Sequence, residues 1–178
     1  MDGTKPPPFI IYKDKQVWRI AREWNASNTE YPTTNEYAFQ GKAWMDKTVF
    51  LQWVEKVWKP FCNGKNSSYL LMDEFLVHLM SACVGAVQDC GTKVDFILNG
   101  YTDKLQVLDV GVIKPFKEYT KQCFERFVVN NIKNRKFNRL EVAKWVADAW
   151  ENIATTTITN TWNSIGFLNK NWTKTKDK

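Results

Sequence analysis

The sequence lacks the residues that several common classes of active site require. It contains a single histidine, His78, and its four cysteines form no Cys-x-x-Cys pair, which argues against a Cys/His zinc site. It also has no glycine-rich phosphate loop of the Walker or Rossmann type and no Gly-x-Ser-x-Gly elbow. These absences exclude the corresponding nucleotide-binding and serine-hydrolase chemistries.

Long apolar runs are absent as well. No stretch of 18 apolar residues occurs, and the N-terminus has no signal-peptide core. The sequence therefore predicts a chain that is neither secreted nor inserted in a membrane, with its cysteines reduced.

The composition is that of a globular protein with a basic surface. The 178 residues predict one domain, and the nine tryptophans favour a large aromatic core. Lys and Arg number 25 against 19 for Asp and Glu, which gives a formal net charge of +6. This balance favours polyanionic partners such as nucleic acid.

Strand and helix patterns alternate along most of the chain, which indicates an α/β fold. Asp46 is predicted to cap the first helix and Pro60 to end it. Thr155 and the two threonines after it are predicted to cap the last. We expect a domain over residues 1–168 and a basic, flexible tail over 169–178. The predicted strands cover 9–12, 36–40, 67–73 and 93–98, and the predicted helices cover 46–59, 75–89, 110–129 and 140–153, followed by a short final helix that bears Ile158, Trp162 and Ile165.

Two aspartates are the strongest candidates for chemistry. Asp73 ends a short apolar strand, and Asp109 lies at the N-cap position of a predicted helix. If strand and helix pack side by side, the carboxylates converge and suit Mg²⁺ or Mn²⁺, which prefer oxygen ligands. The alternatives are a turn residue for Asp73 and a simple helix cap for Asp109. Two aspartates alone form an incomplete two-metal site.

Basic residues surround these candidates. Lys104, Lys114 and Lys117 flank Asp109 and suit a phosphate backbone, although a solvated basic face is the alternative. A basic connector follows over 130–139. His78, five residues after Asp73, is either a packing residue or a catalytic aid. The basic side chains of the connector are Lys133, Arg135, Lys136 and Arg139.

Five stretches, taken together and in order, resemble the DDE superfamily endonuclease domain of pogo, Tigger and jerky-like transposases in the Tc1/mariner group. The resemblance covers nearly the whole chain and corresponds to the C-terminal two-thirds of that domain. The stretches around Asp73 and Asp109 are the most specific. The five are DGTKPPPFIIYK at 2–13, QGKAWM at 40–45, LLMDEFLVH at 70–78, QVLDVGVIKPFK at 106–117 and TITNTWNSIG at 157–166.

The resemblance implies a ribonuclease-H-like fold, in which helices flank a central mixed sheet and three acidic residues bind two Mg²⁺ ions. Asp73 corresponds to the second acid and Asp109 to the third. In the complete family enzyme, water cleaves DNA at the transposon ends, and the freed 3′-hydroxyl attacks target DNA. The resemblance also implies a nuclear protein that binds DNA and is able to oligomerise.

The first acid of the family lies upstream of the motif that here begins at Asp2, and Asp2 itself is not that acid. We therefore expect the first strand and the first acid to be absent from this chain. The resulting gap would leave unpaired backbone beside the Asp73 strand and make the chain poorly stable. Metal binding and cleavage would then require a complete triad. The alternatives are a non-catalytic module that binds nucleic acid or protein through the connector, and a fragment without activity.

Overall fold

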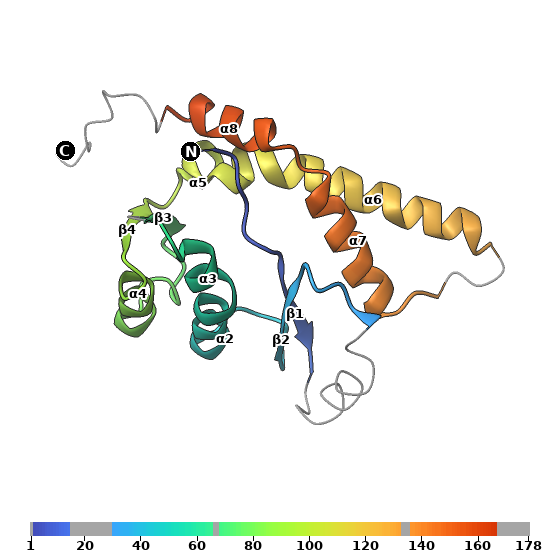
Figure 1. Ribbon diagram of the computed structural model, residues 1–178, viewed down its shortest axis with the longest axis horizontal. Helices are drawn as coiled ribbons and strands as arrows, with labels where there is room; N and C mark the ends of the chain where they lie inside the picture. Colours follow the sequence, from blue (N-terminus) through green and yellow to red (C-terminus); the bar gives the residue numbers. More distant parts are fainter. Residues whose placement is uncertain (1, 15–29, 66–67, 133–135, 167–178) are drawn as a thin grey trace.

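The computed structural model describes residues 2–14, 30–65, 68–132 and 136–166. Its helices and strands alternate along the chain, which confirms the α/β part of the predicted fold class. Figure 1 shows α2, α3 and α4 gathered around β3 and β4 at one end, and the long α6 running past α8 and α7. The bounds are β1 Phe9–Lys13, β2 Glu36–Gln40, α2 Lys47–Trp53, η2 Val54–Trp58, α3 Lys59–Cys62, β3 Ser68–Asp73, α4 Ser81–Gln88, β4 Thr92–Ile97, α5 Thr102–Leu105, η3 Leu108–Val112, α6 Ile113–Asn130, α7 Arg139–Glu151 and α8 Thr155–Ser164.

The strands form two small parallel sheets. β1 pairs with β2, and β3 pairs with β4 in a register that places Asp73 opposite Ile97. Within the described residues, no ladder joins one pair to the other. The described strands therefore make two separate pairs and do not by themselves form the one central mixed sheet that the resemblance implies. Each strand has one hydrogen-bonded neighbour among the described residues, so one edge of β3 is unpaired within that part of the chain.

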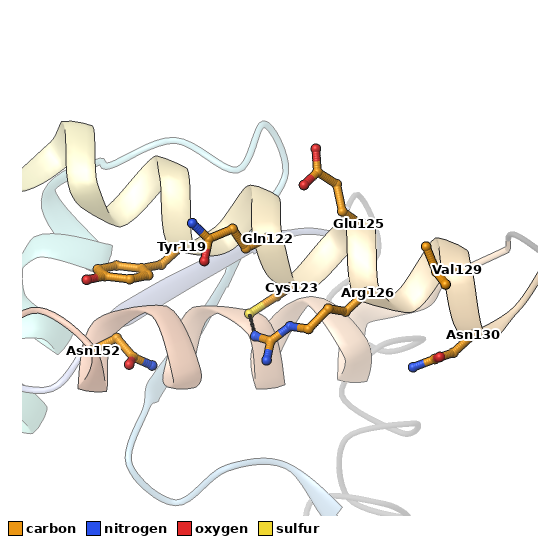
Figure 2. Close-up of a pocket in the computed structure, with 8 residues that line it drawn as sticks. All are labelled: Tyr119, Gln122, Cys123, Glu125, Arg126, Val129, Asn130 and Asn152. Atoms are coloured by element: carbon orange, nitrogen blue, oxygen red, sulfur yellow. Dashed lines mark hydrogen bonds between the residues drawn. The ribbon is translucent and has the colours of Figure 1, made fainter.

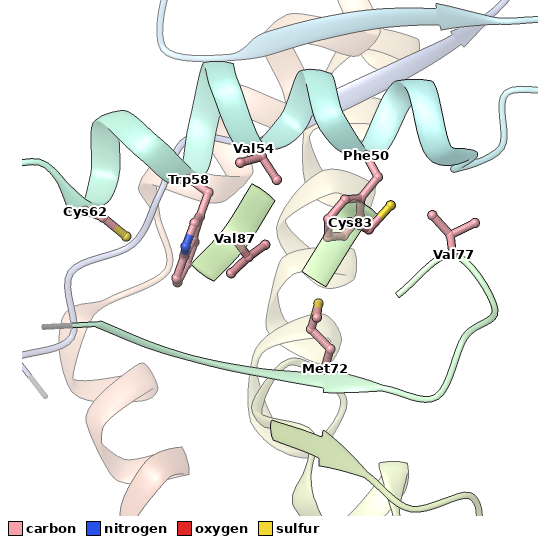
Figure 3. Packing of buried hydrophobic residues seen from close by; sticks show 8 residues of the cluster. All are labelled: Phe50, Val54, Trp58, Cys62, Met72, Val77, Cys83 and Val87. Carbon is pink, nitrogen blue, oxygen red and sulfur yellow. The ribbon is translucent and has the colours of Figure 1, made fainter. Parts of the chain in front are cut away.

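The largest cluster of buried hydrophobic side chains among the described residues lies between β3–β4 and the helices α2, η2, α3 and α4. Figure 3 shows Phe50, Val54 and Trp58 pointing from these helices toward Met72 of β3, with Cys83 and Val87 of α4 beside them. Cys83 and Val87 are fully buried. The Trp58 indole N–H donates to the Thr92 hydroxyl at 2.9 Å, so this buried polar group is satisfied. This core supports the end of β3, where Asp73 lies.

A second cluster attaches the other sheet to α7. Tyr12 of β1 and Tyr37 of β2 stack with centroids 6.2 Å apart and pack against Ala143. The Asn35 amide donates to the Ala143 carbonyl at 2.9 Å, and Tyr12 donates to the Arg139 carbonyl at 3.0 Å. β1 and β2 are therefore held by a helix that lies more than a hundred residues away in the sequence.

The helix that follows Asp46 differs at one end from its predicted bounds. Asp46 caps it as predicted, because its Oδ1 accepts from the Val49 N–H at 2.9 Å. The prediction that Pro60 ends it is wrong, since η2 and α3 continue it to Cys62. Lys59 N–H donates to the Val54 carbonyl, five residues back, so the helix widens just before the proline. The wider turn accommodates the ring and its missing N–H.

The C-terminal helices also begin differently from prediction. α7 starts with a capping box, in which Asn138 accepts from the Glu141 N–H and Glu141 accepts from the Asn138 N–H. The prediction that Thr155 and its neighbours cap α8 is wrong, because the N-cap is Ala154 and makes no side-chain cap bond. The capping box was recognisable as Asn-x-x-Glu in the sequence.

Two absences concern the described residues alone. None of their helices is long and apolar enough to cross a bilayer. All four cysteines are described, and all are free thiols, as predicted. The predicted tail at 169–178 lies outside the described residues.

Candidate metal centre

Asp73 lies where β3 leaves the core. Its side chain is 34% exposed, so it is anchored yet reaches solvent. Its Oδ1 accepts from the Phe75 N–H at 3.4 Å and contacts His78 Nδ1 at 2.6 Å. α4 starts at Ser81 rather than at the predicted residue 75, and a turn lies between Asp73 and the helix. Oδ2 has no hydrogen-bond partner among the described residues.

Asp109 lies in η3 rather than in front of it. The N-cap of η3 is Val107, which makes no side-chain cap bond, so the prediction of Asp109 as a helix cap is wrong. The helix starts earlier than predicted because η3 runs directly into α6, and Val110 N–H already donates to the Gln106 carbonyl at 3.0 Å. Asp109 is exposed and has no hydrogen-bond or ion-pair partner among the described residues. Its carboxylate therefore remains available to a cation.

Among the described residues, no third acid completes a metal site. In the described part of the chain, no three His, Cys, Asp or Glu side chains gather in a way that could hold an ion. Two acids lie near Asp73 along the strands, but both are engaged. Asp95 of β4 accepts a short hydrogen bond from the Tyr69 hydroxyl, and Glu74 accepts from the Asn99 N–H at 3.2 Å. Burial, together with the bond to Asp95, raises the pKa of the Tyr69 phenol, which keeps it a donor.

The predicted nucleic-acid contacts are exposed where the structure describes them. Lys104 lies on α5, and Lys114 and Lys117 lie on the first turns of α6, so all three are on the chain segment that carries Asp109. Lys136 and Arg139 are exposed around the start of α7. Lys133 and Arg135 lie outside the described residues. The first three therefore lie in the same stretch of chain as Asp109, and their contact with DNA stays a prediction.

Gly111 controls how η3 packs on α8. A methyl group at Gly111 would lie 2.1 Å from the Thr161 Oγ1 and 2.9 Å from its Cγ2. Thr161 is buried, and its hydroxyl donates to the Thr157 carbonyl at 2.7 Å, which restrains its rotamer. The absence of a side chain at Gly111 thus allows α8 to hold the turn that carries Asp109.

We predict that Gly111→Ala lowers the free energy of unfolding by about 1–3 kcal/mol, because overpacking outweighs the better helix propensity of alanine. Adding Thr161→Ala should recover most of the loss. The control is Gly85→Ala, since Gly85 has no atoms within 4 Å of an added methyl group. Urea unfolding of the four proteins measures this, and a Gly111→Ala chain as stable as the parent would contradict the packing argument.

A groove of about 560 Å³ lies away from the aspartates. Figure 2 shows that it runs along α6 and reaches Asn152 after α7, with the Arg126 guanidinium donating to Cys123 Sγ at 3.2 Å. None of the predicted site residues lines it. The groove does not contribute to the candidate metal centre.

Comparison with known proteins places these residues in a family. A human and a mouse protein, each described as "Pogo transposable element with KRAB domain", are 25% and 24% identical over 166 residues, which is 88% of this chain. The chain spans 26% of the length of these relatives. No solved structure matches. The family described as "DDE superfamily endonuclease" matches residues 1–162, which include the β3 aspartate and the η3 aspartate in one alignment. With most of its length matched, the chain belongs to the DDE superfamily endonuclease family.

Proposed function

We propose that this chain is part of a transposase-derived DDE endonuclease, in which Asp73 and Asp109 are the second and third of three metal-binding acids. The observation that carries the proposal is the family match through both aspartates, together with the unpartnered Oδ2 at the end of β3. DNA is the proposed partner and the nucleus the proposed location. The parallel β3–α4–β4 unit and the edge of β3 that is unpaired among the described residues support the proposal of a ribonuclease-H-like fold.

The residues fit a hard divalent cation. Asp73 Oδ2 and the Asp109 carboxylate supply the anionic oxygens that Mg²⁺ and Mn²⁺ prefer, and neither carboxylate is neutralised by Lys or Arg within the described residues. When bound, such an ion polarises a phosphodiester oxygen and lowers the pKa of a bound water. The side chains of this chain would orient the ion, and Lys104, Lys114 and Lys117 would hold the phosphate backbone. Two carboxylates are too few for two ions, so cleavage is proposed to require a third acid. A single ion can be held by one or two carboxylates together with water, so the binding of one ion is proposed for this pair alone, in place of the expected need for a complete triad.

Plasmid nicking in Mn²⁺ tests this proposal. Any nicking by the chain, alone or together with the segment that supplies the first acid, should fall to background in Asp73→Asn and in Asp109→Asn. Asp103→Asn is the matched control, because Asp103 is an exposed acid on the neighbouring α5. Nicking at the parental rate in both variants would contradict the assignment of the two aspartates.

The alternative is a non-catalytic nucleic-acid-binding module, and it is favoured by the exposed lysines of α5 and α6 together with Lys136 and Arg139. This alternative predicts no nicking and DNA affinity that both aspartate variants retain. Replacing Lys114 and Lys117 with Gln should then reduce the slope of log K against log salt by about 0.9 for each phosphate that a lysine no longer neutralises. DNA binding without salt dependence would exclude both proposals.

A further inference from the structure

The only histidine of the chain is in direct contact with Asp73. His78 Nδ1 lies 2.6 Å from Asp73 Oδ1 and 3.3 Å from the Asp73 carbonyl oxygen. The backbone between them forms a turn, in which the His78 N–H donates to the Phe75 carbonyl at 2.8 Å. The contact is therefore built into the turn that follows β3.

The chemistry of the two groups fixes the direction of this bond. A carboxylate oxygen accepts and cannot donate, so Nδ1 carries the proton and donates to Oδ1. The Phe75 N–H donates to the same oxygen at 3.4 Å. Both donors thus reach Oδ1, and Oδ2 is left without a partner among the described residues.

Aromatic packing holds the imidazole in this position. The ring centroids of Phe50 and Phe75 each lie 5.5 Å from that of His78, and the Phe75 ring is nearly perpendicular to the imidazole. Phe50 is itself 2% exposed, and the His78 side chain is 21% exposed. A ring confined between a buried phenylalanine and a second aromatic side chain loses the freedom to swing away from Asp73.

We propose that His78 is a positioning residue, which holds Asp73 through Oδ1 and so presents Oδ2 to the divalent cation. The inference rests on the proposed metal-binding function of Asp73 and adds a residue to it. A partner that orients a carboxylate ligand raises metal affinity because the ligand is arranged before the ion binds. A histidine that merely fills space would affect folding without affecting the metal.

Two substitutions separate these roles. His78→Phe keeps an aromatic ring between Phe50 and Phe75 and removes the donor. In His78→Asn, the amide nitrogen occupies nearly the position of Nδ1 and keeps the donor. We expect Mn²⁺ affinity, measured from the free-ion electron paramagnetic resonance signal, to be retained in His78→Asn and to fall about 10- to 100-fold in His78→Phe.

Nuclear magnetic resonance supplies a second readout that needs no metal. Because the chain has one histidine, its imidazole nitrogen signals require no assignment. At a pH of about 8.5, at which a free imidazole is neutral, the parent chain should show the Nδ1–H tautomer. In Asp73→Ala the signal should change to the Nε2–H tautomer.

The outcomes of these experiments decide separately on the role of His78 and on the metal function of Asp73. An Nε2–H tautomer in the parent, parental Mn²⁺ affinity in His78→Phe, or equal weakening in His78→Asn and His78→Phe overturns the role of His78. If Asp73→Asn nevertheless weakens Mn²⁺ binding, the proposed metal function survives. If Asp73→Asn binds Mn²⁺ as the parent does, the proposed metal function fails, and the inference fails with it.

Discussion

Phe50→Ala is expected to lower the free energy of unfolding by about 3–5 kcal/mol. Phe50 projects from α2 into the β3–α4 core and is 2% exposed, with its ring 5.5 Å from those of Trp53 and His78. Removing the ring opens a cavity between helices that the neighbouring side chains cannot fill without moving. A domain of this size is typically stable by about 5–15 kcal/mol, so the loss is a large fraction of the total.

Urea unfolding followed by circular dichroism measures the effect, with two controls. Phe50→Leu, which keeps much of the volume, should cost less than about 1.5 kcal/mol. Leu76→Ala should change stability by less than about 0.5 kcal/mol, because Leu76 is 76% exposed in the turn after β3. A Phe50→Ala chain that unfolds at the parental urea concentration would show that this cluster does not stabilise the fold.

The elements that sequence patterns predicted well are those whose signals are local. β3 was predicted from its run of apolar residues, and α2 from its helical apolar stripe and its Asp46 cap. In both cases the residues that decide the structure are adjacent in the chain, so periodicity and capping suffice.

Features that depend on distant contacts were not predictable in the same way. Asn35, just before β2, donates a buried hydrogen bond to the Ala143 carbonyl of α7, and no local pattern records that interaction. α4 starts at Ser81 instead of the predicted residue 75, after a turn in which the Asp73 carboxylate contacts the Phe75 N–H and the His78 imidazole. The apolar pattern that predicted the helix does not record this turn.

The candidate site was partly accessible from sequence. Asp73 and Asp109 were identified by their surrounding motifs, and the family match includes both. Their positions alone did not decide whether each aspartate is a metal ligand or only a cap or turn residue, because a single aspartate before a helix is a common cap. The hydrogen bond from His78 and the packing of Gly111 on Thr161 required the fold, since each joins residues through a turn or across helices.

The proposed function requires that Asp73 and Asp109 bind one divalent cation together. The strand end and the η3 turn each present a carboxylate that has an unpartnered oxygen among the described residues. Replacing either with asparagine removes the charge and keeps the shape. The affinity for a hard cation depends on the number of charged oxygens, so each substitution should weaken binding strongly.

Mn²⁺ titration of the parent, Asp73→Asn, Asp109→Asn and the control Asp103→Asn is therefore the most direct measurement. We predict binding of one Mn²⁺ by the parent and by the control. Each of the other two variants should lose at least about 100-fold in affinity, which is more than the loss expected when only a residue that orients a ligand is removed. Equal Mn²⁺ affinity in all four proteins would contradict the account, and a loss confined to Asp73→Asn would remove Asp109 from the site.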